Sequence, residues 1–382
     1  MKNIVYLLVL SVVLTSCKAM KMYKKEEIVA KPSGVQKFEI KNKRILLTSK
    51  IDNKDCLLFF DTGAMVTDIT DTLLISNFST LEKSTFGSGT DALGKNFSIL
   101  RFPASFENDL FSSKNKVITY VSKAKSTSGC PAPANVDKIQ GIFGIDFFEY
   151  SETNFLLDFS NSQIEVVSQE KQNQLIAEGF KEIKSKFPSF SLMKIFLNIN
   201  GKEYAMDFDT GNTSSLVLPY KEVENFKNLQ TQKAIGITHF SVAGASESNT
   251  TYYYNDAPIS VGNENVKSAL TVSENLKIYN VGLGFIKGFD WIIDYKNKKV
   301  YYRKNNLEIS TESTSPKIGA MIQDEKLKIV LLAGEFINQY NLGDEIVSVN
   351  GEKVTTENIC EMRNLVLTTE DQNTLKIEIK KN

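Results

Sequence analysis

The chain has 382 residues, too many for one ordinary core, and this length favours two or three folded units. Lysine plus arginine equals aspartate plus glutamate, at 45 each, so no net field would hold nucleic acid or an anionic membrane surface. The 24 phenylalanines and 14 tyrosines need cores to bury them, which predicts a folded globular protein.

The first 17 residues have the pattern of a secretory signal: a basic start, an apolar run and the closing segment Leu14-Thr15-Ser16-Cys17. The apolar run is shorter than the roughly 20 residues that a transmembrane helix needs. The closing segment resembles the lipobox of bacterial lipoproteins. The resemblance implies that residues 1–17 are a lipoprotein signal peptide and that acylated Cys17 anchors the chain in a bacterial cell envelope, facing the periplasm or the cell surface. An ordinary cleaved signal with an incidental cysteine is the alternative.

Residues 18–33 are basic and polar without periodicity, which predicts a tether between the lipid and the folded body. Behind the tether, an internal repeat organises the chain, because residues 51–63, IDNKDCLLFFDTG, match residues 199–211, INGKEYAMDFDTG, without a gap. Each copy predicts a hairpin, since the turn-forming pairs Asp52-Asn53 and Asn200-Gly201 stand between apolar runs. Each returning strand ends in Asp-Thr-Gly.

The repeat continues downstream with different spacing. The first copy has 141–148 followed by 155–159, and the second has 282–285 followed by 291–295 and 300–302, so that Gly141 and Gly282 open corresponding segments. We therefore predict two mainly β lobes, over 34–168 and 180–308, joined by a polar connector that favours a helix.

Two Asp-Thr-Gly segments at equivalent points of a duplicated hairpin resemble the aspartic peptidases. The resemblance is to retropepsin-like lobes fused in tandem, as in pepsin-like enzymes, and it covers about residues 34–308. It implies an endopeptidase acting on polypeptides, with Asp61 and Asp209 as the catalytic pair. Two carboxyls about 3 Å apart cannot both ionise, so the pair presents an acid and a base together and needs no metal or cofactor.

The residues around the pair have implied roles too. Thr62 and Thr210 would link the two loops by hydrogen bonds, and Gly63 and Gly211 would permit their close approach. Because tandem lobes build the pair within one chain, we expect a monomer.

Two features leave the activity and its pH optimum open. Ala64 lacks the hydroxyl that lowers the pKa of a neighbouring carboxylate, and Asn212 departs from the serine, threonine or alanine usual in the family. A non-catalytic peptide-binding lipoprotein is therefore the alternative function. Asp207 lies on the same side of its strand as Asp209, so it either raises the proton affinity of the pair or is an ordinary solvated carboxylate.

Flap hairpins cover the substrate in the family that the chain resembles. Small residues after each motif are the candidates, with ordinary turns as the alternative. These candidates are Gly87, Ser88 and Gly89 in the first lobe and Ala243 and Gly244 in the second. A serine or cysteine nucleophile would have only His239 as its base, and the sequence has no zinc or phosphate-binding motif.

The remaining cysteines allow one pairing within a lobe. Cys56 and Cys130 fall in the same predicted lobe, and export would expose them to an oxidising compartment, so a disulfide between them is possible. Cys360 lies in a helix-like stretch, where a buried free thiol is expected.

Residues 317–382 have a different pattern, with short strands around one helix expected over 357–367 and a last strand over 374–380. The segment from Leu342 to Gly351 resembles the Gly-Asp to Asn-Gly segment of PDZ domains, which implies a small α+β module that binds peptide C-termini by strand addition. Packing on the second lobe alone is the alternative. The expected carboxylate-binding loop is Ile318, Gly319, Ala320 and Met321.

Overall fold

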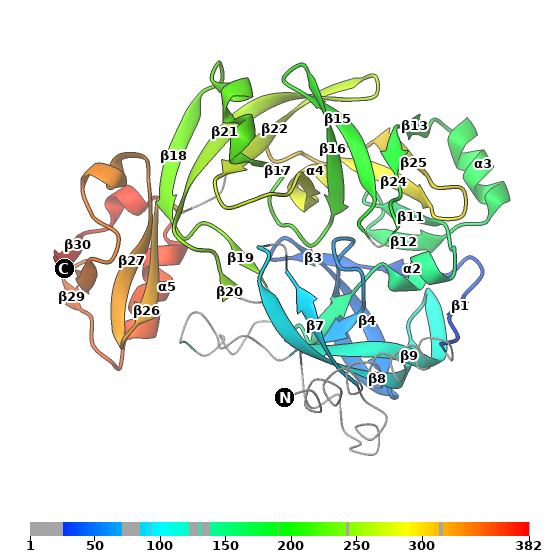
Figure 1. Cartoon of the computed structure of the whole chain (residues 1–382), viewed down its shortest axis with the longest axis horizontal. Helices are drawn as coiled ribbons and strands as arrows, with labels where there is room; N and C mark the ends of the chain where they lie inside the picture. The colour runs from blue at the N-terminus through cyan, green and yellow to red at the C-terminus, as the bar shows by residue number, and fades with distance from the viewer. Residues whose placement is uncertain are drawn as a thin grey trace, which may run out of the picture.

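The computed structural model describes residues 26–70, 85–91, 93–121, 130, 138–189, 191–241, 244–312 and 316–381. The predicted signal peptide with Cys17 lies outside these residues, as does the predicted flap residue Ala243. The protein is mainly β, as the sequence predicts. In Figure 1 one large sheet lies below the other, and strands of a smaller sheet lie at the right. No helix in the described residues is long and apolar enough to cross a membrane.

The predicted tether ends earlier than residue 33. Val29 and Ala30 already pair with Ser112 and Phe111 of lobe one, and the Glu26 carboxylate forms an ion pair with the buried Lys116 ammonium. Residues 26–33 therefore belong to the folded body, because a strand edge and a buried cation give them partners that composition alone does not reveal.

Lobe one is built on a nine-stranded sheet in the order β1-β9-β6-β10-β5-β4-β8-β7, with β3 beside β4. Along β5 buried residues alternate with partly exposed ones, as a sheet with one covered face requires. The strands are β1 Val29–Ala30, β3 Glu39–Lys41, β4 Arg44–Ile51, β5 Lys54–Phe60, β6 Asp68–Ile69, β7 Thr85–Thr90, β8 Asn96–Glu107, β9 Phe111–Val121 and β10 Gly141–Phe143.

Lobe two repeats this plan and extends it, since its sheet runs on into the C-terminal module and reaches thirteen strands. A separate two-stranded hairpin lies beside it. The lobe-two strands are β14 Ser185–Lys186, β15 Lys194–Ile199, β16 Lys202–Asp209, β17 Leu216–Pro219, β18 Thr231–Gly236, β19 Phe240–Ser241, β20 Gly244–Ala245, β21 Asn249–Val261, β22 Glu264–Ser273 and β23 Asn280–Gly282, with η3 Tyr220–Phe226 and α4 Leu283–Ile286.

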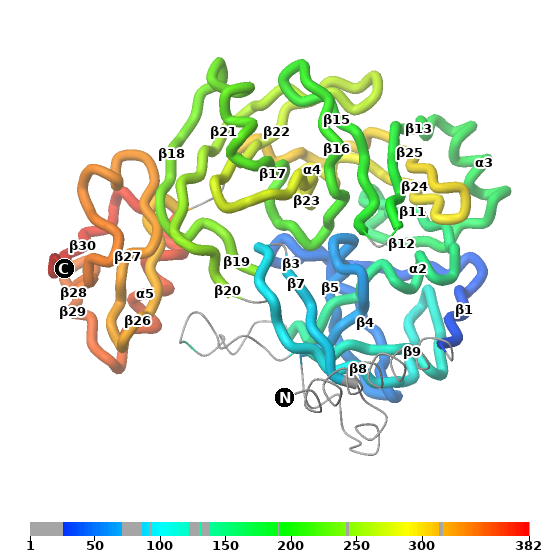
Figure 2. Tube along the Cα trace, in the orientation of Figure 1, coloured from blue at the N-terminus to red at the C-terminus, as the bar shows by residue number. Residues whose placement is uncertain are grey.

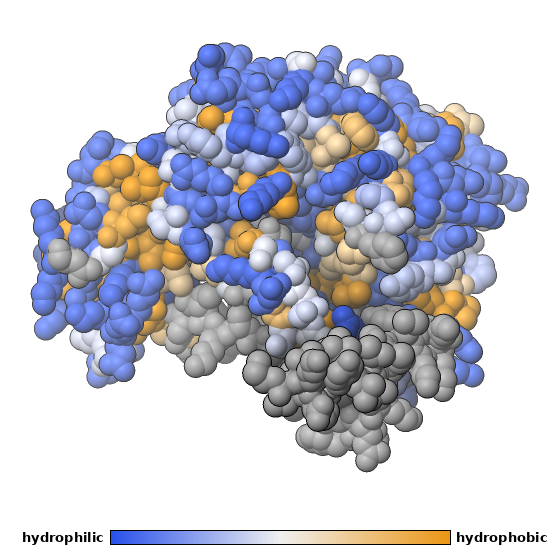
Figure 3. Space-filling model, viewed as in Figure 1, coloured by the Kyte–Doolittle hydropathy of each residue, from blue (hydrophilic) through white to orange (hydrophobic). Residues whose placement is uncertain are grey.

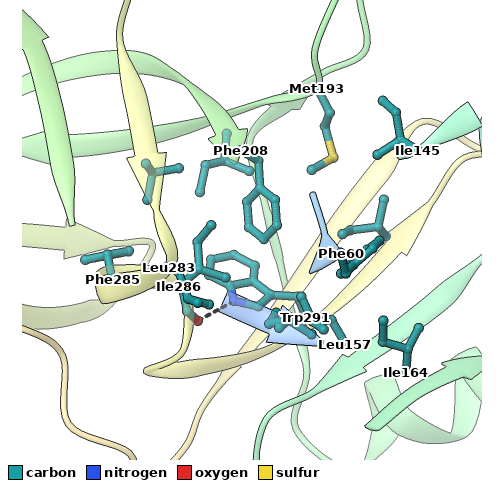
Figure 4. Packing of buried hydrophobic residues seen from close by; sticks show 14 of the residues in the cluster. Phe60, Ile145, Leu157, Ile164, Met193, Phe208, Leu283, Phe285, Ile286 and Trp291 are labelled. Atoms are coloured by element: carbon teal, nitrogen blue, oxygen red, sulfur yellow. Dashed lines mark hydrogen bonds between the residues drawn. The ribbon is translucent and has the colours of Figure 1, made fainter. Parts of the chain in front are cut away.

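A six-stranded antiparallel sheet joins the lobes, with β11 of lobe one paired to β24 of lobe two at its centre. One hydrophobic core runs from lobe one through this sheet into lobe two, and the rings of Phe208 and Trp291 lie 5.1 Å apart in it (Figure 4). The elements are β2 Val35–Lys37, α2 Asp146–Tyr150, β11 Phe155–Asp158, β12 Gln163–Val166, α3 Gln169–Ala177, β13 Lys181–Ile183, β24 Phe289–Asp294 and β25 Lys299–Lys304.

The C-terminal module has its own hydrophobic core and contains the expected helix and last strand. It lies at the end of the molecule opposite β13 and α3, where apolar residues gather on the face shown in Figure 3. Strand β27 pairs with β18 of lobe two, Ala333 opposite Ala234, so the two sheets are continuous. The elements are β26 Ile318–Gln323, β27 Lys326–Ala333, η4 Gly334–Asn338, β28 Glu345–Val349, β29 Glu352–Lys353, α5 Ile359–Thr368, η5 Gln372–Thr374 and β30 Ile377–Lys380.

The two predicted hairpins are confirmed. Asp52 and Asn53 have φ of 48° and 60°, and Asn200 and Gly201 have φ of 50° and 86°, as a two-residue turn between right-twisted strands requires.

The strand register aligns the second half of the repeat residue by residue, which the sequence comparison did not do. Phe143 pairs with Phe60, so Gly144 comes beside Asp61, whereas Gly282 pairs directly with Asp209. Gly144 is thus the counterpart of Gly282. Both pack against the loop after Asp-Thr-Gly, since a Cβ would lie 2.7 Å from the carbonyl oxygen of Ala64 at Gly144 and 2.6 Å from that of Asn212 at Gly282.

The predicted cysteine pairing is also wrong. Cys130 forms its disulfide with Cys360 on α5, across a Cα–Cα distance of 5.6 Å, so the bond joins lobe one to the C-terminal module. Cys56 is free, since its expected partner pairs elsewhere. It is buried on β5, where its thiol donates to the Ser49 carbonyl oxygen.

Candidate active site

The structure brings Asp61 and Asp209 together at the junction of the lobes. Asp61 directly follows strand β5, and Asp209 is the last residue of strand β16. Each carboxyl packs against the glycine of the opposite loop. A Cβ on Gly211 would lie 2.3 Å from Asp61 Cγ, and a Cβ on Gly63 would lie 2.4 Å from Asp209 Cγ. No side chain fits at either glycine, so the close approach of the loops depends on both.

The threonines hold the loops by four reciprocal hydrogen bonds. The Thr62 hydroxyl donates to the Phe208 carbonyl oxygen at 2.9 Å, and the Thr210 hydroxyl donates to the Phe60 carbonyl oxygen at 3.0 Å. Each hydroxyl also accepts from the N–H of the opposite threonine, at 3.0 Å for Thr62 N–H and 2.9 Å for Thr210 N–H. Both threonines are buried, so this link resists competition from water.

Burial and the charge of Asp209 raise the pKa of Asp61 well above its ordinary value, and a hydrogen bond between the carboxyls adds to the effect. The Gly63 N–H donates to Asp61 Oδ1 at 2.7 Å and opposes the rise. Both aspartates keep partial solvent exposure. The pair therefore retains a proton at pH values where an isolated aspartate has lost its own, and solvent still reaches it.

Asp209 accepts hydrogen bonds from three donors. The Gly211 and Asn212 N–H groups donate to Oδ1 at 2.9 and 3.0 Å, and Asn280 Nδ2 donates to Oδ2 at 2.6 Å. Asn280 was not predicted from the sequence. The available signal was a polar residue two positions before Gly282, where lobe one has Ile142 two positions before Gly144.

Asp207 is neither free in solvent nor a simple modifier of the pair. It is half-buried and forms an ion pair with Lys194 on the neighbouring strand. Desolvation raises the pKa of Asp207 against the effect of Lys194, and the charge of Asp209 raises it slightly further. The two carboxylates of β16 therefore interact, as the shared strand face predicts.

The first predicted flap is a hairpin, but its tip is not where the small residues are. Gly87, Ser88 and Gly89 lie within β7, paired with β8, and the turn follows at Asp91–Lys95. In lobe two, β19 and β20 form the second hairpin, with Gly244 in β20.

The ends of the two hairpins are in contact. Figure 2 shows the first hairpin reaching β19 and β20. The Ser241 hydroxyl donates to Asp91 Oδ2, and Lys95 Nζ donates to the Ala245 carbonyl oxygen. These two hydrogen bonds connect the hairpin of lobe one to the hairpin of lobe two.

The residues predicted to form a carboxylate-binding loop lie instead in strand β26, where Ile318, Gly319, Ala320 and Met321 are all buried. The main-chain N–H groups at its start are already paired. Gln372 Oε1 accepts from Lys317 N–H at 2.6 Å and from Ile318 N–H at 3.0 Å. A peptide carboxylate would have to displace the Gln372 side chain to reach these donors.

Other chemistry has little support in the part of the chain that the structure describes. No group of three or more His, Cys, Asp and Glu side chains is arranged there to hold a metal ion. Burial lowers the pKa of His239 to about 4, and its Nε2 is buried without a hydrogen-bond partner.

Comparison with known proteins identifies no family. No family model matches the chain, and no curated protein matches it. Among solved structures, the crystal structure of conglutin gamma, a basic 7S globulin from lupine seeds, has a TM-score of 0.46 at 9% identity, over 72% of this chain and 96% of that one. A similarity of this size carries no argument about function.

Proposed function

We propose that the chain is an aspartic endopeptidase in which Asp61 and Asp209 together activate water for the hydrolysis of polypeptides. The observation that carries the proposal is the packing of each carboxyl against the glycine of the opposite Asp-Thr-Gly loop. The raised pKa of Asp61 supports it, because a pair that retains one proton contains an acid and a base at the same pH.

Hydrolysis by such a pair proceeds without a covalent intermediate. The ionised carboxylate takes a proton from water as the water oxygen attacks the peptide carbonyl carbon, and the shared proton moves to the carbonyl oxygen. The tetrahedral diol then breaks its C–N bond as the amide nitrogen gains a proton and a diol hydroxyl returns one, which restores the singly protonated pair. The paired hairpins would hold an extended substrate and limit the access of water.

The C-terminal module has a place in the proposal as a PDZ-like element for substrate recruitment or regulation. Its strand β27 pairs with β18, which precedes the β19–β20 hairpin by a few residues. We further propose a monomer that is anchored in a bacterial cell envelope through acylated Cys17. The Cys130–Cys360 disulfide favours an oxidising compartment and supports this location.

The test is cleavage of a diverse peptide pool by the purified full-length chain between about pH 3 and pH 8, the span in which a coupled pair of carboxyls exchanges protons. We expect cleavage by the wild type and a loss of at least about a thousandfold in the Asp61→Asn variant, which keeps the shape but removes the shared acid–base pair. Asp55→Asn is the matched control, since Asp55 is an exposed aspartate of the strand that leads to Asp61.

Cleavage that survives in Asp61→Asn would contradict the proposal. A folded wild type that cuts no peptide at any pH would instead favour the alternative of a peptide-binding protein without hydrolysis.

A further inference from the structure

The surroundings of the two carboxyls are not equivalent. Apart from its contact with Asp209, Asp61 accepts one hydrogen bond in the described part of the chain, from the Gly63 N–H. Asp209 accepts three, two at Oδ1 and one at Oδ2. Hydrogen bonds donated to a carboxylate stabilise its charged form, so the asymmetry favours ionisation of one particular member of the pair.

The donor at Asp209 Oδ2 belongs to a chain of side-chain amides whose direction is fixed at its far end. The Ser214 main-chain N–H donates to Asn212 Oδ1 at 3.0 Å, and a main-chain N–H can only donate. Asn212 Nδ2 must then point to Asn280 Oδ1, which it reaches at 2.7 Å. The Nδ2 of Asn280 is thereby directed at Asp209 Oδ2, at 2.6 Å.

Lobe one has no counterpart of this amide chain. Ile142 pairs with Phe59, two residues before Asp61, just as Asn280 pairs with Asp207, two residues before Asp209. An isoleucine side chain cannot donate a hydrogen bond. Ala64, in the place of Asn212, has no polar side chain either.

We propose that Asn280 is a positioning residue that holds the carboxylate of Asp209 ionised and oriented, so that Asp61 carries the shared proton. This inference deepens the proposed function and rests on it. In the catalytic cycle, Asp209 is then the base that takes a proton from water, and Asp61 is the acid that protonates the carbonyl oxygen. Asn280 is 3% exposed, so water does not readily replace its hydrogen bond.

The other charges that face the pair do not account for this assignment. Asp207 faces Asp209 from its own strand and disfavours a charge there, although Asp207 is itself paired with Lys194. From lobe one, Asp61 and, more remotely, Asp68 face the same region, and both are acids. The negative charge on Asp209 is therefore favoured by the three hydrogen bonds that it accepts, one from Asn280 and two from main-chain N–H groups.

The test is the pH profile of kcat/KM for peptide cleavage by the full-length chain with Asn280→Leu, which keeps the size of the side chain and removes the donor. Loss of a hydrogen bond to a charged group should move the acidic limb upward by about one to two pH units, because ionisation of Asp209 becomes less favourable. Ile142→Leu is the matched control in lobe one and should leave the limb in place. An acidic limb that does not move in Asn280→Leu, whatever happens to kcat, overturns the inference.

Two additions keep the test decisive. Asn212→Ala retains Asn280 but removes the amide that directs it, and we expect a smaller upward shift; if Asn280→Leu does not fold, an unshifted limb in Asn212→Ala overturns the inference. The second addition is a ¹³C-carboxyl NMR titration of aspartates 61 and 209 in the wild type and the variants. If the wild type cleaves nothing, the proposed function fails, yet an upward shift of the first ionisation of the pair in the variants still supports the role of Asn280, and no shift overturns it.

Discussion

Gly63 and Gly211 are the residues on which the joining of the two loops depends most directly. Each faces the opposite carboxyl at a distance that excludes even a methyl group. A β-carbon closer than 3.0 Å to those atoms requires the carboxyl or its loop to shift. The requirement is the same in both lobes, although the residues that follow the glycines differ.

We predict that Gly63→Ala and Gly211→Ala each lower kcat by roughly a hundredfold, because a displacement of about 1 Å at reacting groups has that effect. Peptide cleavage together with thermal unfolding is the measurement. A Gly63→Ala variant that folds and keeps its wild-type kcat would show that the close approach of the loops is not needed.

Asp68, on β6 behind the Asp61 loop, links stability to pH. Burial raises its pKa to about 7, with a further contribution from Asp146, and its Oδ1 is buried without a partner. Between pH ~4, its value in an unfolded chain, and ~7, the folded protein binds a proton at this site that the unfolded chain has lost. The contribution of Asp68 to the free energy of unfolding therefore falls as the pH rises through that window.

We predict that Asp68→Asn removes this fall and makes the protein about 2–4 kcal/mol more stable than the wild type at pH 8, with little difference at pH 4. Denaturant unfolding at several pH values measures it. The exposed Asp55→Asn variant is the control and should keep the wild-type slope. Equal slopes in Asp68→Asn and the wild type would contradict the prediction.

Among the secondary-structure elements, the sequence correctly predicted the features that depend only on residues adjacent in the chain. The turns at Asp52-Asn53 and Asn200-Gly201 were correct because positive φ is a local demand. The flap tip was misplaced, since Gly87 and Gly89 are small for a different reason: Arg101 and Phe97 of the adjacent strand lie over them.

Asn280 was missed for a similar reason. Its contact with Asp209 spans 71 positions and depends on the register of β23 against β16, which the repeat in the sequence did not supply.

The contact between the two hairpin tips should slow the local opening of both hairpins. Lys95→Met with Ser241→Ala removes both side-chain contacts between the tips and leaves the turn at Asp91 intact. Two such contacts together contribute on the order of 1–3 kcal/mol, so amide hydrogen exchange in β7, β8, β19 and β20 should be roughly tenfold faster. Lys233→Met, at an exposed site on β18, is the control, and unchanged exchange in the double variant would show that the tips do not stabilise each other.

At the scale of the whole molecule, the C-terminal module is attached to both lobes. The pairing of β18 with β27 attaches the C-terminal module to lobe two, and the Cys130–Cys360 disulfide attaches it to lobe one. The sequence separation of the two cysteines is 230 residues, and nothing in their local sequence indicates the pairing. Such a link is visible only once the lobes and the module are placed together.

We predict that replacing both Cys130 and Cys360 with serine lowers the free energy of unfolding by up to about 5 kcal/mol, the chain-entropy value for so long a loop. Thermal unfolding with and without reductant measures the effect, and reductant should no longer change the melting temperature of the double variant. Peptide mapping without reduction provides the check, because a Cys56–Cys130 cross-link in place of Cys130–Cys360 would contradict the structure.

The central claim is that one catalytic unit is formed by one aspartate from each lobe. The most direct test compares peptide cleavage by the wild type, Asp61→Asn, Asp209→Asn and the double variant under identical conditions. Residues that act as one unit are not additive, so each single variant should lose about as much activity as the double variant. Activity that survives in either single variant, or losses that simply multiply in the double variant, would contradict a shared pair.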